Sequence, residues 1–198
     1  DMTGGSLWKN ILVFSLPLMM TQMLEVLFNL SDVAIAGKYA DYIALGAVGS
    51  TALLVSLFTG ILIGMGAGVN VRTAHRLGAE KTSGSSETVA RTVYSGLIVC
   101  LIIGIILCLV CNIFARPMLE ALKTKDELIE SAVLYLKIYA LGMPAMAVYN
   151  FGNGVLSACG ETKKPLIYLS IAGVLNVILN IFFVVVCKKA ADGVAIAS

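Results

Sequence analysis

Long apolar stretches separated by short polar segments dominate this sequence. Five of them, near residues 10–37, 44–71, 89–114, 132–158 and 165–187, are long enough for helices that cross a bilayer, which requires about 20 residues each. A sixth stretch starts at 193 and runs to residue 198. Barrel strands alternate polar and apolar positions over segments of about 10 residues, and these stretches do not. The pattern predicts an all-α polytopic membrane protein with five transmembrane helices and the start of a sixth.

The polar segments between the stretches carry turn and helix-end signals. Arg116-Pro117 is expected to end the third stretch, and Gly160 to Pro165 separates the fourth from the fifth. Thr124 and Glu127 have the spacing of a capping box, which predicts a helix start. We expect that helix to lie at the membrane interface and to continue into the fourth span.

The second stretch contains Gly60, Gly64 and Gly68 at four-residue intervals, with Gly66 beside them. Small residues at this spacing let a neighbouring helix approach closely in a membrane. Packing is favoured over a phosphate-binding loop, because no Lys-Ser/Thr pair follows and the glycines lie in apolar sequence.

A polar stripe runs along the first stretch. Gln22, Glu25, Asn29 and Asp32 are spaced by three, four and three residues, so all four share one face of a helix. An ionisable group at mid-membrane costs at least about 2.5–3.5 kcal/mol and is tolerated where it faces protein or a water-filled pathway. The two acids either form hydrogen bonds to a neighbouring helix or line a functional site. Pro17, in the first half of the same stretch, predicts a kink that is either static or a hinge.

Amide side chains mark two further stretches. Asn176 and Asn180 lie one turn apart in the fifth, where they could meet the acidic face of the first and line a cavity. In the fourth, Asn150 and Asn153 are interpreted either as cavity residues or as hydrogen-bonding links between helices.

Composition supports the membrane assignment and excludes several function classes. Only 13% of residues are charged, against roughly 25% in soluble domains. No basic patch with interleaved aromatic residues suggests nucleic-acid binding. His75 is the single histidine, no HExxH motif occurs, and all five cysteines lie in apolar segments. We therefore expect no enzymatic activity, no cofactor and no metal centre.

The basic residues leave the orientation nearly undetermined. Lys and Arg residues divide equally between the two sides of the predicted topology. The long basic loop from Arg72 to Arg91 favours a cytoplasmic amino terminus.

Several motifs together resemble one family. They are the run from Pro17 to Gly37 followed by LGAVG at 45–49, GILIGMGAGVNVRTAHRLGAE at 60–80, LSACGETKKP at 156–165, LNVILN at 175–180 and DGVA at 192–195. In order and spacing they resemble the multidrug and toxic compound extrusion (MATE) family. The resemblance implies one lobe of a two-lobe, six-plus-six transporter that exports cationic or amphipathic compounds against a proton or sodium gradient by alternating access. It also implies a multi-pass protein of the bacterial cytoplasmic (inner) membrane.

The resemblance assigns roles to particular residues. Asp32 aligns with an acid linked to cation coupling, where H⁺ or Na⁺ would bind, and Pro17 aligns with a proline linked to bending. Many members carry an acid where this chain has Asn180, which cannot titrate. From spacing, Glu25 could take that place as a second coupling residue. Gln22, Asn29, Asn150, Asn153, Asn176 and Asn180 are expected to line the substrate cavity.

The chain ends before its sixth span is complete, so 1–198 is expected to be an incomplete amino-terminal lobe that needs a carboxy-terminal partner lobe. The alternatives are a lipid-linked oligosaccharide flippase of the same superfamily, which should carry cationic residues in its cavity, and a non-transporting membrane scaffold.

Overall fold

The structure is a computed structural model that describes residues 7–39, 42–83, 87–187 and 191–197. The described residues form seven α-helices and one π-helical turn and include no strand. In chain order they are α1 (Leu7–Tyr39), α2 (Tyr42–Ser83), α3 (Glu87–Ala121), α4 (Asp126–Leu141), α5 (Met143–Ala158), α6 (Lys163–Ile181), the π turn η1 (Phe182–Val186) and α7 (Ala191–Ala197). The predicted all-α class is confirmed.

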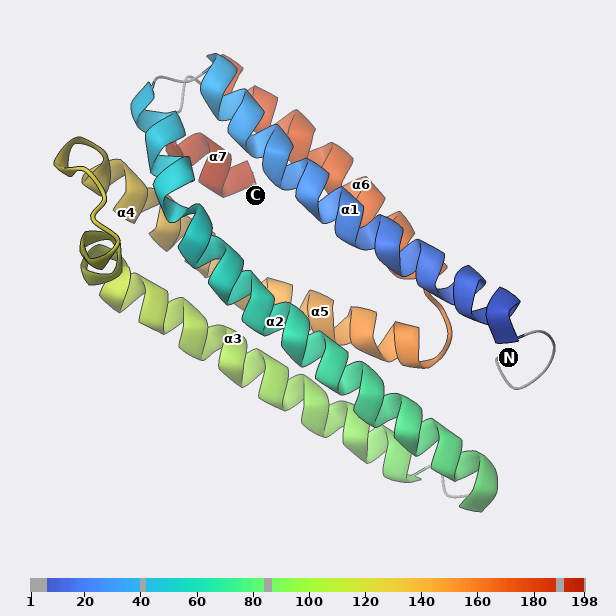
Figure 1. The fold of residues 1–198 in the computed structure, drawn as a ribbon. Coiled ribbons are helices and arrows are strands. Elements are labelled where there is room, and N and C mark those ends of the chain that lie inside the picture. Colours follow the sequence, from blue (N-terminus) through green and yellow to red (C-terminus); the bar gives the residue numbers. More distant parts are fainter. Residues whose placement is uncertain (1–6, 40–41, 84–86, 188–190, 198) are drawn as a thin grey trace.

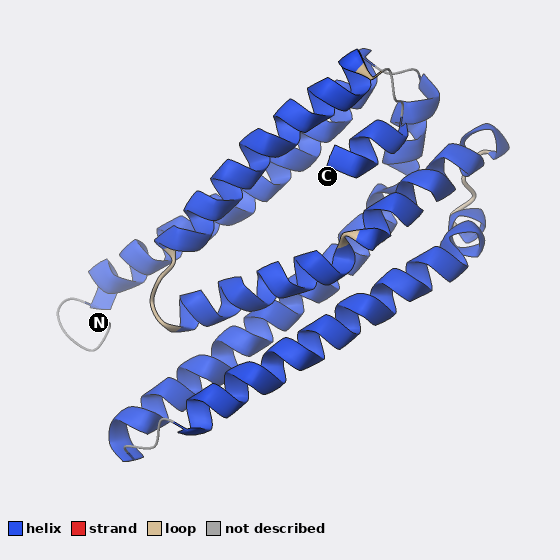
Figure 2. Ribbon diagram, turned by 180° about the vertical axis from the view of Figure 1, so that it is seen from behind, coloured by secondary structure: helices blue, strands red, loops and turns tan. Residues whose placement is uncertain are grey.

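The helices pack as two groups that meet at one end (Figures 1 and 2). Helices α1 and α6 lie side by side, while α2 packs against α3, α4 and α5. The short α7 packs against α4 near the end where α1 is followed by α2. Buried apolar residues of α2, α3, α4 and α7 gather at that end and form the core that joins the groups, including Leu62, Leu119, Leu136 and Val194.

Four helices, α1, α2, α3 and α6 with η1, are long and apolar enough to cross a membrane, and the bent pair α4–α5 makes a fifth if it is counted as one span. Large apolar side chains such as Ile98, Ile102 and Ile171 are exposed on their outer faces. Such surfaces are stable against lipid, since acyl chains are as apolar as the side chains. The limits of each span in the bilayer remain predictions, and Ser198 of the expected sixth span lies outside the described residues.

Two expected helix ends are wrong. Helix α3 continues through Pro117 to Ala121. Arg116 supports this last turn by pairing at 3.0 Å with Glu120 on the same helix and at 3.0 Å with Glu130 on α4. The proline removes one backbone donor, but the rest of the turn forms.

The predicted capping box does not form either. Helix α4 begins at Asp126 with Lys125 at the N-cap and no side-chain cap, which places Glu127 one position too early to reach back to Thr124. One face of the helix, with Ala132, Leu136 and Ala140, packs into the core, and its expected place at the membrane interface remains a prediction.

The fourth span is broken where continuity was expected. Helices α4 and α5 meet at Gly142 with a bend of 46°. Pro144, in the first turn of α5, has no N–H to donate to the carbonyl of Ala140, so the α4 hydrogen-bond ladder cannot run through this point. Beyond the break, α5 packs against α2.

Of the four glycines singled out in the second stretch, Gly66 allows a close helix contact. A Cβ on Gly60, Gly64 or Gly68 would meet nothing within 4 Å, so no described helix packs on these three glycines. Instead, a Cβ on Gly66 would lie 2.6 Å from the carbonyl oxygen of Asn150, and a Cβ on Gly154 would overlap the carbonyl of Gly66. The backbones of α2 and α5 therefore touch at this crossing.

Candidate functional site

A row of buried, hydrogen-bonded polar side chains joins α1 to α6. The amide nitrogen of Asn180 donates to Oδ1 of Asp32 at 2.6 Å and also lies 3.2 Å from Oδ1 of Asn176. Asn176 in turn donates to the carbonyl oxygen of Ala197 in α7, at 3.3 Å. Asp32 is only 8% exposed and Asn180 is fully buried. A carboxylate is thus held inside the bundle by an amide that lies 148 residues away in sequence.

These hydrogen-bonded side chains border a cavity of about 400 Å³ between the two helix groups. Both acids of α1 line it, and Asn176 and Asn150 line it from α6 and α5. The other walls are largely apolar or aromatic, and they comprise Phe28, Thr59, Ile63, Tyr139, Met146, Tyr149, Leu169, Ala172, Gly173, Leu175, Leu179 and Ala197. A mostly apolar cavity with a few polar groups is the usual form of a small-molecule site.

Glu25 and Asp32 share the cavity without touching each other. They lie two helical turns apart, about 10 Å along α1 at 1.5 Å per residue. Asp32 lies at the contact with Asn180, whereas Glu25 is partly buried on the open wall. Asp32 is therefore held by a hydrogen bond from Asn180, and both acids line the space that a ligand would fill.

Phenolic hydroxyls form part of the site that sequence reasoning missed. Tyr139 lies 3.3 Å from the hydroxyl of Thr59, and its ring stacks on Tyr135 with centroids 6.2 Å apart. The hydroxyl oxygen of Tyr149 is buried and has no hydrogen-bond partner among the described residues. The spacing of Tyr135 and Tyr139, one turn apart in α4, could have indicated a shared face.

Several predicted site residues lie elsewhere. Gln22 is exposed and does not line the cavity, although it shares the helix face of Glu25 in the ideal pattern. Asn153 faces another direction, where its Oδ1 accepts a bond from Ser157 at 3.4 Å. Asn150 does line the cavity, and its amide nitrogen donates to the carbonyl oxygen of Met146 in its own helix at 2.9 Å. The side chain of Asn29 lies outside the described residues.

Pro17 is buried within α1, which Figure 1 shows as one continuous helix. The hydroxyl of Thr21 donates to the Pro17 carbonyl at 2.9 Å, so a side chain satisfies this backbone acceptor. The hinge role of Pro17 remains a prediction.

Comparisons with known proteins identify relatives over nearly the whole chain. The profile of the MatE family matches residues 17–182. The Bacillus subtilis "Probable multidrug resistance protein YpnP" is 29% identical over 98% of this chain. The Pseudomonas aeruginosa "Multidrug resistance protein PmpM" is 30% identical over 87% of it. The chain spans 43% and 35% of the lengths of these two relatives.

Solved structures give the same fold. A crystal structure of a MATE protein in the bent conformation superimposes with a TM-score of 0.89 at 24% identity, over 98% of this chain and 42% of that one. A MATE transporter in an outward-facing conformation gives 0.86 over 96% and 41%. These matches confirm the expected single lobe, and the chain belongs to the MATE family.

Proposed function

We propose that this chain is the amino-terminal lobe of a secondary antiporter that exports cationic or amphipathic compounds in exchange for H⁺ or Na⁺ by alternating access. The observation that carries the proposal is the burial of Asp32 beside a cavity, where Asn180 binds its carboxylate at 2.6 Å. A membrane protein that needed only helix contacts could use amides alone. A buried carboxylate beside a cavity supports an exchangeable charge.

In the proposed cycle Asp32 and Glu25 attract a cationic substrate into the cavity, while its aromatic walls take the apolar part. Binding of a coupling ion to Asp32 neutralises the carboxylate and favours substrate release. Asn180 cannot take up a proton, so its role is to orient Asp32 by donating a hydrogen bond. If the ion is Na⁺, the buried Oδ1 of Asn180, which has no partner among the described residues, is an oxygen that could bind it beside Asp32.

The complete transporter would need a carboxy-terminal lobe facing the cavity, in the bilayer of a bacterial cytoplasmic membrane with the amino terminus inside. The substrate is set by that whole cavity. A Shewanella oneidensis relative that is 25% identical bears the name "FAD transporter", so the names of relatives are not limited to drugs. The flippase alternative is disfavoured, because no Lys or Arg is among the described residues that line this cavity.

The test is efflux of a cationic dye from vesicles that contain the intact protein, driven by a pH or sodium gradient. Asp32→Asn keeps the size of the side chain and removes its charge, and we expect it to abolish gradient-driven efflux. Glu161→Gln, which removes an exposed acid between α5 and α6, is the matched control. Undiminished efflux with an unchanged pH dependence in Asp32→Asn would exclude Asp32 as the coupling residue, and absence of any efflux by the wild type would favour the scaffold alternative.

A further inference from the structure

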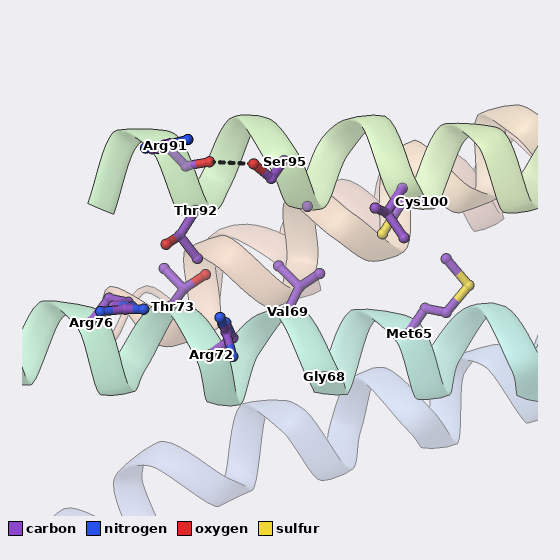
Figure 3. Close-up of a pocket in the computed structure, with 12 residues that line it drawn as sticks. Met65, Gly68, Val69, Arg72, Thr73, Arg76, Arg91, Thr92, Ser95 and Cys100 are labelled. Atoms are coloured by element: carbon purple, nitrogen blue, oxygen red, sulfur yellow. Dashed lines mark hydrogen bonds between the residues drawn. The ribbon is translucent and has the colours of Figure 1, made fainter. Parts of the chain in front are cut away.

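A second cavity lies between α2 and α3, away from the site that contains Asp32. Its volume is about 580 Å³. Arg72, Thr73 and Arg76 line it from α2, while Arg91, Thr92 and Ser95 line it from α3 (Figure 3). Its other walls are Met65, Gly68, Val69, Gly96, Val99 and Cys100.

The lining changes from cationic to apolar along the helix axes. Figure 3 shows the arginine and threonine side chains at one end and Met65 and Cys100 at the other. The cationic end lies towards the α2–α3 connection, and the apolar end lies towards the middle of the two helices. A ligand that fits this gradient has an anionic head and an apolar tail.

The cationic end also contains a buried hydroxyl without a partner. Thr73 is 1% exposed, and its Oγ1 makes no hydrogen bond among the described residues. Thr73 and Thr92 point towards each other across the gap between the helices (Figure 3). Burial of a hydroxyl without a hydrogen-bond partner costs free energy, because the group loses its hydration. A bound anion would remove this cost by accepting a hydrogen bond from the hydroxyl.

The arginine charges are available for a ligand. Among the described side chains no carboxylate lies within ion-pair distance of Arg72, Arg76 or Arg91, although Glu80 lies one turn beyond Arg76. The guanidinium fork matches the oxygens of a phosphate group. A second hollow on α2 shares Arg72 and Arg76 and adds His75, which extends the basic surface.

The position of the cavity along α2 indicates whether its anionic ligand is a membrane lipid or a free anion. Helix α2 has 42 residues and is therefore about 63 Å long, twice the roughly 30 Å of bilayer hydrocarbon. In Figure 1 the α2–α3 hairpin extends beyond the end of α5. Because α2 is longer than the hydrocarbon layer, we expect the arginines near its carboxy-terminal end to reach the level of the lipid headgroups. We propose that this cavity binds the phosphate of an anionic phospholipid, with Thr73 and the three arginines around the phosphate and Met65, Val69 and Val99 against the start of the acyl chains.

The test is native mass spectrometry of the intact purified protein with phosphatidylglycerol, phosphatidylcholine or inorganic phosphate as the probe. We expect phosphatidylglycerol to bind more tightly than phosphatidylcholine. Arg72→Gln/Arg76→Gln should weaken its binding roughly 30-fold, since each basic residue near an anionic surface contributes roughly a fivefold factor. Lys163→Gln/Lys164→Gln removes the same charge from the same end of the bundle, outside the cavity, and should change binding less than threefold.

Variants of Thr73 distinguish a specific phosphate site from general attraction of anionic lipids to basic residues. Thr73→Val keeps the shape but removes the hydroxyl, and should weaken phosphatidylglycerol binding about tenfold, while Thr73→Ser should retain it. Melting temperatures of all variants in detergent check that the fold is kept. Equal effects of the arginine and lysine pairs, or no difference between the two Thr73 variants, would overturn the proposal. Tight binding of inorganic phosphate with no preference for phosphatidylglycerol would overturn the lipid as its source.

Discussion

At the scale of single residues, the contact between Asp32 and Asn180 defines the candidate site. Sequence spacing predicted that Asn176 and Asn180 share a face, and the structure brings that face against Asp32. The same reasoning could not exclude Gln22, because spacing places it on the same helix face as the two acids but does not show that it is exposed and away from the cavity. No sequence pattern indicated Thr73 as a binding residue, since it is distinguished only by a buried hydroxyl that has no hydrogen-bond partner among the described residues.

Replacing Asn180 tests how strongly it supports Asp32. Asn180→Leu removes the amide that donates to the buried carboxylate, and we expect the free energy of unfolding to fall by about 1–3 kcal/mol. Denaturant unfolding of the purified protein in detergent micelles, read by far-ultraviolet circular dichroism, measures it. The double variant Asn180→Leu/Asp32→Asn should lose less than the sum of the two single variants, because the carboxylate charge to which Asn180 donates is then absent. Strictly additive losses would show that the two side chains are not coupled.

At the scale of elements, apolar length predicted each long helix, but not where the helices break or touch. The run around 132–158 gives no sign that Pro144 ends one helix and begins another, because prolines also occur inside continuous membrane helices such as α1 and α3. Glycine spacing indicated a packing face on α2. Which glycine meets a neighbour depends on how α5 crosses it, and that crossing follows from the bend at Gly142.

The α2–α5 crossing gives a matched pair of variants. Gly66→Ala would place a methyl group 2.6 Å from the Asn150 carbonyl oxygen, so the helices must separate. We expect a loss of about 1–3 kcal/mol, the usual range for overpacking. Gly64→Ala, two residues away with open space around it, should be neutral or stabilising by up to about 1 kcal/mol. Thermal melts in one detergent compare them, and equal melting temperatures would contradict the crossing.

At the scale of the whole molecule, the family resemblance predicted more than the residues alone could. Charge counts left the orientation open, and no pattern within 198 residues specifies how α1 and α6 stand apart from α2, α3 and α5. That separation depends on contacts between residues far apart in sequence, such as Phe28 of α1 against Gly173 of α6. The family motifs implied one lobe of a two-lobe transporter, and the solved structures confirm that single-lobe fold without any prediction of this separation.

Two exposed cysteines test the topology. Cys159 follows α5 and Cys187 follows η1, so the span from Lys163 to Val186 separates them. In single-cysteine variants with alanine at the other four positions, a membrane-impermeant maleimide should label Cys187 in right-side-out vesicles and Cys159 only after the membrane is opened. The buried Cys111, retained alone, is the unreactive control. Labelling of Cys159 alone would place the amino terminus outside, and labelling of both would contradict the crossing by α6.

The backbone contact between Gly66 and Gly154 has a mechanical consequence. Helices that touch through their main chains have no side-chain layer that could repack when they slide, so α2 and α5 are expected to move as one rigid body. Helices α1 and α6 meet that body across a cavity and can shift with fewer contacts to break. If the proposed transport cycle holds, the lobe would therefore deform on the side of Asp32, where the proposed ion binding and the movement would act on the same side chain.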